Sequence, residues 1–255
     1  MIYTELIRDM TWSYSRLECF ESCPYRWFLK YIEHEQEEPL FYSSYGSFMH
    51  ELLAGIYKGE LTREAAKDRF LFGFAETVRG ERPPGRIAAD YIDAGFSYLK
   101  DFEPLPVDPA GVELNVEFRV GRVPFTGFLD LLGRCGRKYT VIDHKSRNLK
   151  PRSGRGKPTQ NDRDIDSMLR QLYLYAEAVY QTFGEYPASL CFNCFRNGTF
   201  IEEPFQKDKL SDALTWAEGL VGEIEQCEDF GPRPEYFKCR YLCGVHNQCC
   251  YYEGA

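Results

Sequence analysis

The sequence lacks any long hydrophobic run and any excess of positive charge. No stretch approaches the 18 or more apolar residues of a membrane-spanning helix, so we expect no membrane association. The first residues, MIYTELIRDM, do not follow the basic-then-apolar order of a secretory signal, which favours a cytoplasmic protein. The 31 basic and 39 acidic residues give a net charge of −8. The overall field therefore repels polyanions, and any nucleic-acid surface must be local.

Cysteine is plentiful by contrast, with ten residues in 255. In a small secreted protein ten cysteines would indicate disulfides. This chain is longer, is 44% hydrophobic and carries no export signal, so it can build a core without crosslinks. We therefore interpret the cysteines chiefly as thiols for a metal.

A nucleotide-binding loop is also missing. The letters GRGKPT imitate part of one, but Pro151 occupies the place of its first glycine and Pro158 that of its hydroxyl residue, so we expect no ATP site. The surrounding segment 146–164 is rich in proline, glycine and positive charge, and we expect a mobile arm that contacts DNA phosphates. An ordinary solvated surface is the alternative. The candidate DNA-binding residues are Arg147, Lys150, Arg152, Arg155 and Lys157.

Hydrophobic spacing predicts an α/β fold with a central mixed sheet. Strands of alternating or β-branched character, separated by glycine-containing turns, are predicted at 112–120, 123–135, 138–146 and, as a strand or hairpin, 188–205. Helices are predicted at 13–32 with a break at Pro24, and at 45–58, 62–79, 86–102, 165–183 and 207–227. We expect one domain over 1–255, with a helical part at 1–110, a core at 111–227 and a cysteine-bearing tail at 228–255.

The stretch VIDHKS places Asp143 and Lys145 on one face of a strand, because positions two apart share a face. An ordinary salt bridge is the simplest explanation. However, Asp130 lies in the preceding strand, and hairpin pairing would bring the two carboxylates together. Such a pair repels unless a cation lies between, and oxygen ligands suit Mg²⁺ or Mn²⁺. With a lysine that can hold water, this predicts a site that hydrolyses phosphodiesters.

Three further polar residues lie on predicted helices. His50 follows apolar neighbours and could be a structural histidine or a metal ligand. Gln171 and Tyr175 lie one helical turn apart on one face, where both could reach a phosphate or water. Taken singly, each is compatible with an ordinary structural role.

Together these residues resemble the PD-(D/E)XK nuclease superfamily, in its RecB-like branch that includes the CRISPR-adaptation exonucleases. The ordered motifs are S-x-S-x-L-x-x-F-x-x-C-P at 13–24, G-x-x-x-H at 46–50, G-x-x-D at 127–130, D-x-K at 143–145 and Q-x-x-x-Y at 171–175. The resemblance implies a restriction-endonuclease-like core in which His50, Asp130, Asp143 and the backbone carbonyl of His144 bind the cation. It also implies that Lys145 positions the water and that Gln171 and Tyr175 support the substrate.

The tail holds Cys239, Cys243, Cys249 and Cys250 within twelve residues. By the same resemblance, three of them join Cys23 in an iron-sulfur cluster of the 4Fe-4S type, with Cys249 and Cys250 competing for the last position. The three residues between Cys239 and Cys243 depart from the usual C-x-x-C, and Cys243 with His246 would also suit Zn²⁺, so zinc and free thiols stay as alternatives. The remaining cysteines are expected in the core, namely Cys19, Cys135, Cys191, Cys194 and Cys227.

These features predict a metal-dependent DNA nuclease, favouring an exonuclease on single-stranded ends. We expect it to act in recombination, repair or acquisition of foreign DNA in a bacterium, archaeon or phage, with a recombination or CRISPR-adaptation protein as a candidate partner. The alternatives are a nuclease-fold protein that binds DNA or a partner without cutting, and a site-specific endonuclease.

Overall fold

A central five-stranded mixed sheet organises the molecule, as the sequence predicts. The computed structural model describes residues 3–154 and 156–252. The strands are β1 (Asp108–Val120), β2 (Val123–Cys135), β3 (Lys138–Lys145), β4 (Ser189–Cys194) and β5 (Thr199–Pro204), and they lie in this order across the sheet. All neighbours are antiparallel except β3 and β4, which are parallel. The parallel pair is connected through a long helix, as a crossover requires.

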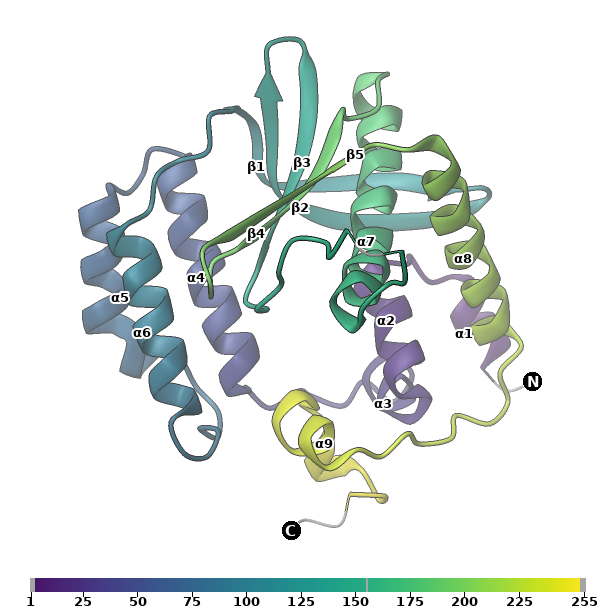
Figure 1. The fold of residues 1–255 in the computed structure, drawn as a ribbon. Helices are drawn as coiled ribbons and strands as arrows, with labels where there is room; N and C mark the ends of the chain where they lie inside the picture. The colour runs from purple at the N-terminus through teal and green to yellow at the C-terminus, as the bar shows by residue number, and fades with distance from the viewer. Residues whose placement is uncertain (1–2, 155, 253–255) are drawn as a thin grey trace.

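The helices form two groups on either side of the sheet (Figure 1). They are α1 (Thr4–Arg8), α2 (Tyr14–Ser22), α3 (Pro24–Tyr31), α4 (Phe41–Tyr57), α5 (Arg63–Thr77), α6 (Ile87–Lys100), α7 (Gln160–Phe183), α8 (Lys207–Glu225) and α9 (Tyr236–Leu242), with a 3₁₀ turn at His246–Gln248. The larger hydrophobic cluster joins α2, α3, α7 and α8 to the sheet. A second, aromatic cluster holds α4, α5 and α6 together. The N-terminal helices are thus divided between two cores.

The predicted break at Pro24 separates α2 from α3. Ser13 caps α2 by accepting a hydrogen bond from the backbone N–H of Arg16 at 3.3 Å. Cys23 has an extended backbone, and Pro24 begins the next helix, where its missing N–H costs nothing. The joint therefore exposes the Cys23 sulfur at a helix N-terminus.

The described residues of the segment after β3, 146–154 and 156–159, are partly fixed by hydrogen bonds to the start of α7, unlike the loose arm that the composition suggests. Asp162 accepts hydrogen bonds from the backbone N–H groups of Ser153 (2.9 Å) and Thr159 (2.7 Å), and Asn161 bonds both backbone groups of Lys150. The Thr159–Asp162 capping box also starts α7 five residues earlier than apolar spacing predicts. Polar capping, which hydrophobic periodicity does not record, thus decides the local structure.

Other boundaries also differ from prediction. β1 begins at Asp108 rather than at 112, and α4 begins at Phe41 rather than at 45, while α1 and α9 are short helices that the sequence pattern does not reveal. Cys19, Cys191 and Cys194 are buried as expected. The expectation is wrong for Cys135, which is exposed at the β2–β3 turn, and Cys227 is only half-buried.

Gly127 on β2 lets α7 approach the sheet closely. A Cβ atom at this position would lie 2.6 Å from Cε1 of Tyr175. Gly127→Ala should therefore displace the Tyr175 ring and lower the free energy of unfolding by about 1–3 kcal/mol, as overpacking typically does. Urea denaturation of the two proteins measures the difference.

Gly222→Ala in α8 is the matched control, since nothing lies within 4 Å of its added Cβ. Alanine is the better helix former, so this change should be neutral or stabilising by up to about 1 kcal/mol. Equal effects of the two substitutions would show that Gly127 does not determine the packing of Tyr175.

Candidate functional site

Two buried carboxylates lie where β2 and β3 separate. Strand pairing continues to Leu131 and Ile142, and the same register places Asp130 opposite Asp143. Beyond that point, the Asp130 side chain takes the place of a backbone acceptor, because its Oδ2 accepts a hydrogen bond from the backbone N–H of His144 at 2.7 Å. Asp130 is 9% exposed and Asp143 is 2% exposed. Two acids are therefore held in a poorly solvated place.

Lys145 connects this pair to α7. Its Nζ lies 2.7 Å from Asp143 Oδ2 and donates to Gln171 Oε1 at 2.8 Å. Gln171 in turn donates from Nε2 to Tyr175 Oη at 3.1 Å. The structure thus joins the D-x-K and Q-x-x-x-Y motifs in one chain of polar contacts. Gln171 contacts the Lys145 ammonium directly, and Tyr175 contacts Gln171.

His50 reaches the same place from α4. Its Nε2 lies 2.9 Å from the backbone oxygen of His144, and its Nδ1 lies 3.4 Å from Asp130 Oδ1 and 4.0 Å from Glu113 Oε1. Both ring nitrogens therefore face oxygen atoms. Because a neutral imidazole donates from only one nitrogen, the arrangement needs either a proton or a metal cation at the other.

The side chain of His144 has a different role from its backbone. It points to the opposite face, where Nδ1 lies 2.9 Å from the amide nitrogen of Asn193 and the ring stacks on Tyr57. Burial lowers the pKa of His144 to about 4, so the ring is neutral at physiological pH. The imidazole fills the core, and only the carbonyl faces the candidate site.

The charges of the cluster depend on each other. Burial raises the pKa of Asp143 to about 6, with repulsion from Asp130 adding to the effect. Burial also opposes ionisation of Asp130, but contact with His50 outweighs it and lowers the pKa of Asp130 to about 2. Burial alone would lower the pKa of Lys145 and of His50, yet the two carboxylates raise both. The carboxylates therefore stabilise the positively charged forms of Lys145 and His50, and they would also stabilise a bound cation.

These residues fit a divalent cation. Asp143 Oδ2 is buried without a hydrogen-bond partner among the described residues, since its contact with Lys145 lacks hydrogen-bond geometry. Carboxylate and carbonyl oxygens are the ligands that Mg²⁺ and Mn²⁺ prefer. His50 and the His144 oxygen are already in contact at 2.9 Å, so both are near the carboxylates. Ligand atoms of His50, Glu113 and Asp130 also lie within 4.8 Å of one another.

Glu113 is the member of this cluster that the sequence argument missed. It lies on β1 opposite Asp130, because Val112 pairs with Leu131 and Leu114 with Leu129. Its φ of +50° is unusual for a residue with a side chain, so the surrounding structure must hold it there. The turn at 121–122 fixes the β1–β2 register, and extending that register to Glu113 could have identified it.

The five predicted DNA-binding residues are not equivalent. Arg152 pairs with Glu203 and Asp166, at 2.6 Å in each case, so its charge is already engaged. Arg147, Lys150 and Lys157 are exposed, and Arg155 lies outside the described residues. A phosphate contact of Arg152 therefore stays a prediction, although two carboxylates already share its charge.

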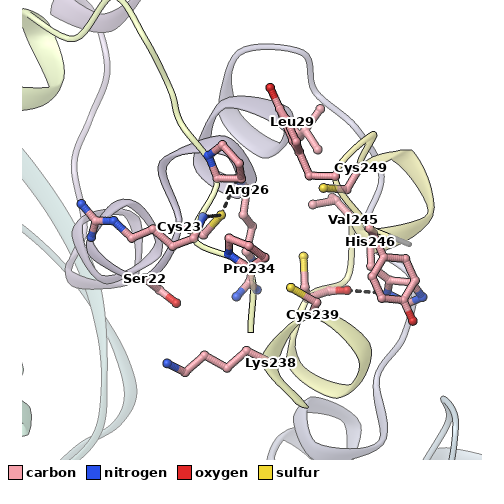
Figure 2. A pocket seen from close by; sticks show the side chains of 15 residues that line it. Ser22, Cys23, Arg26, Leu29, Pro234, Lys238, Cys239, Val245, His246 and Cys249 are labelled. Carbon is pink, nitrogen blue, oxygen red and sulfur yellow. Dashed lines mark hydrogen bonds between the residues drawn. The ribbon is translucent and has the colours of Figure 1, made fainter. Parts of the chain in front are cut away.

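The predicted cysteine ligands line one small pocket between α3 and the tail. Cys23, Cys239, Cys243 and Cys249 all contribute to it. Figure 2 shows the sulfur atoms of Cys23, Cys239 and Cys249 directed towards a shared space. Cys250 is exposed instead, with its sulfur 3.4 Å from the Tyr25 hydroxyl.

The environment and spacing of these thiols restrict what they can hold. The Cys23 sulfur accepts backbone N–H groups from Arg26 at 3.5 Å and Arg233 at 3.4 Å, as a thiolate ligand does. Zinc–sulfur bonds of about 2.3 Å place the sulfurs of a tetrahedral site about 3.8 Å apart. Among residues 3–154 and 156–252, no three cysteine or histidine ligand atoms of this pocket lie within 4.8 Å of one another. The spacing is thus wider than a zinc site needs.

Comparisons with known proteins agree with this geometry. The sequence pattern of the PD-(D/E)XK nuclease superfamily matches residues 11–250. The crystal structure of a protein from Eubacterium rectale, provisionally named an exonuclease, superposes with a TM-score of 0.56 at 13% identity. The superposition covers 99% of this chain and 92% of that one. At this identity the likeness concerns the fold. No curated protein matches the sequence, and no described helix is long and apolar enough to cross a membrane.

Cation binding should depend on pH through the buried acid. Because the pKa of Asp143 is raised to about 6, protons occupy it below that pH and compete with a metal. Affinity for Mn²⁺ should fall as pH is lowered through 6, by up to about tenfold per pH unit for each proton displaced. Because the pKa of His50 is also raised, its protonation should make the affinity for Mn²⁺ begin to fall at a higher pH than Asp143 alone would.

Isothermal titration calorimetry with Mn²⁺ at several pH values between 5 and 8 measures this dependence. Asp93→Asn changes an exposed acid of α6 and should leave it unaltered. An affinity that stays constant between pH 5 and 7 would contradict the assignment of Asp143.

Proposed function

Because the chain belongs to the PD-(D/E)XK nuclease superfamily, we propose that it is a divalent-metal-dependent DNA exonuclease acting on single-stranded ends. The observation that carries the proposal is the buried pair Asp130 and Asp143, with Lys145 between Asp143 and Gln171 and with His50 completing the cluster. Metal-assisted hydrolysis of a phosphodiester uses anionic ligands to hold the metal and can use a fixed positive side chain beside it.

In this proposal, each side chain has a distinct task. When bound, Mg²⁺ or Mn²⁺ supplies a Lewis acid that neutralises charge on the phosphoryl oxygens and makes water more acidic. Asp130, Asp143, His50 and the His144 carbonyl hold it. Lys145 stays charged because the carboxylates raise its pKa, so it acts as a donor that orients water or a phosphoryl oxygen and not as a base.

Gln171 and Tyr175 act on Lys145 in this scheme. Gln171 accepts one N–H of the ammonium and Asp143 forms an ion pair with it, so the remaining N–H groups are free to donate in the reaction. Tyr175 Oη accepts a hydrogen bond from Gln171 Nε2 and so fixes the orientation of the Gln171 amide. Glu113, near His50 Nδ1, either orients the imidazole or contributes an oxygen to the cation.

The branch of the superfamily, the pathway and the partner are proposed from the order of the sequence motifs. The motifs at 13–24 and 171–175 favour the RecB-like branch with the CRISPR-adaptation exonucleases, and hence roles in recombination, repair or acquisition of foreign DNA, with a partner from one of these processes. The superposed E. rectale protein, provisionally named an exonuclease, supports the preference for ends. A cytoplasmic location in a bacterium, archaeon or phage-infected cell suits such substrates.

We also propose that Cys23, Cys239, Cys243 and Cys249 bind a 4Fe-4S cluster. The spacing of the thiols, wider than a zinc tetrahedron, and the two N–H groups on Cys23 support this choice over Zn²⁺. Burial raises the pKa of Cys243 and of Cys249, so both need a cationic partner to ionise. The cluster would join the α2–α3 joint to the tail.

Asp143→Ala and Lys145→Ala should each lower the cleavage rate of end-labelled single-stranded DNA at least about 100-fold, because each removes a group that stabilises the reacting phosphate. The assay contains Mg²⁺ or Mn²⁺ and compares linear single strands, circular single strands and circular duplex. Cutting of the linear strand alone is the expected result for an exonuclease.

Asp93→Ala and Lys100→Ala, both exposed on α6, serve as matched controls and should retain activity. Retained activity in both site variants would refute the assignment. Cutting of circular substrates would show that the protein is an endonuclease and not an exonuclease. Binding of DNA by the metal-loaded wild type without any cutting would indicate an inert scaffold.

Cys23→Ser should abolish iron binding and lower the melting temperature. Loss of about 2 kcal/mol or more would correspond to a fall of roughly 4–8 °C for a chain of this size. Iron and sulfide analysis of anaerobically purified protein, with a melting curve, measures both. About four iron atoms per wild-type chain are expected.

Cys135→Ser is the control, because this thiol is exposed and far from the tail in sequence. Cys249→Ser should behave like Cys23→Ser, whereas Cys250→Ser should retain the cluster. Stoichiometric zinc without iron in the wild-type protein would exclude the cluster.

A further inference from the structure

A second charged pocket lies beside the candidate site, and the roles proposed above do not use it. It encloses about 270 Å³, and its polar lining includes Ser15, Ser22, Arg26, Lys30, Arg147 and Lys238. We call it the basic pocket. The serines come from one face of α2, Arg26 and Lys30 from one face of α3, Lys238 from α9, and Arg147 from the segment after β3. Four distant parts of the chain thus converge on it.

The basic pocket has a small excess of positive charge. Arg26 and Lys30 share one carboxylate, that of Glu37, and Lys238 pairs with Glu235 at 2.6 Å. Glu18 also lines the pocket. No ion pair within the described residues involves Arg147, which is exposed. Four cations and one anion line the pocket, and two further carboxylates outside the lining pair with these cations, so one positive charge stays in excess and suits an anion of charge −1.

The basic pocket is also close to the proposed reaction centre. Arg147 follows Lys145 by two residues, which is at most about 7 Å along an extended chain. That length is comparable to the step from one phosphate to the next in a nucleic-acid strand. Glu18 connects the two regions as well, because its charge contributes to the raised pKa of Lys145.

We propose that the basic pocket binds a phosphodiester group of the substrate strand, adjacent to the one that is hydrolysed. This inference rests on the proposed nuclease function. A phosphodiester carries one negative charge and accepts hydrogen bonds, which a guanidinium, an ammonium and hydroxyl groups can donate. Because α9 contains Cys239 and Lys238 and ends next to Cys243, the cysteine-bearing tail supplies Lys238 and would contribute directly to substrate binding.

The test uses the full chain with its metal content intact. Fluorescence anisotropy of a labelled single-stranded oligonucleotide, measured at several salt concentrations, compares wild type with Arg147→Ala, Lys238→Ala and the conservative Arg147→Lys. Each alanine variant should bind about three- to tenfold more weakly. Each should also reduce the slope of log affinity against log salt by about 0.7, the value for one lost phosphate contact on a single strand.

Arg147→Lys should restore most of the salt slope, which a merely structural role would not predict. In cleavage assays both alanine variants should raise KM with little change in kcat. Arg82→Ala, an exposed arginine outside the pocket, is the control and should match wild type in every measurement.

Oligonucleotides with one neutral methylphosphonate locate the contact. One internal substitution next to the cleaved bond should weaken binding to wild type but not further to the Arg147→Ala, Lys238→Ala double variant. Equal weakening in both proteins would overturn the proposal, as would an effect confined to a terminal phosphate. If wild type neither binds nor cuts DNA, the proposed function itself fails, whereas normal cutting by both pocket variants refutes only the pocket.

Discussion

The repulsion between Asp130 and Asp143 is the constraint around which the site is arranged. Neighbouring strands hold the two carboxylates where water is scarce, and burial therefore raises the pKa of Asp143 to about 6. The protein offsets this cost with positive groups from separate elements, Lys145 on β3 and His50 on α4. Asp143 Oδ2 is already 2.7 Å from the Lys145 ammonium, so a divalent cation bound to Asp143 would share this carboxylate with Lys145.

The sequence predicts the parts of this arrangement that depend on local rules. Strand alternation places Asp143 and Lys145 on one face, and the short turn at 136–137 sets the register that brings Asp130 opposite. Pro24 predicts the helix joint at Cys23. In each case the relevant interaction spans few residues, so spacing and turn chemistry are sufficient.

The unpredicted parts depend on long-range contacts or on polar capping. Nothing in the helix around His50 specifies that its ring meets the carbonyl of His144, which lies 94 positions later. Composition indicates a loose segment after β3, but the side chains of Asn161 and Asp162 fix it to the start of α7. Glu113 can be predicted only by extending the β1–β2 register to the residue opposite Asp130.

The distribution of charge suggests how an acidic chain can act on an acidic polymer. Its net charge repels DNA at long range, so in the proposed function attraction would come from a cation bound at the carboxylates and from the excess positive charge near Arg147. The two regions are joined through β3, because Arg147 follows Lys145 by two residues. An iron-sulfur cluster at Cys23 would hold two walls of the basic pocket, α3 and α9, at a fixed separation. In this proposal the structural metal and the affinity for substrate would be linked through Lys238, and the cluster itself would take no part in hydrolysis.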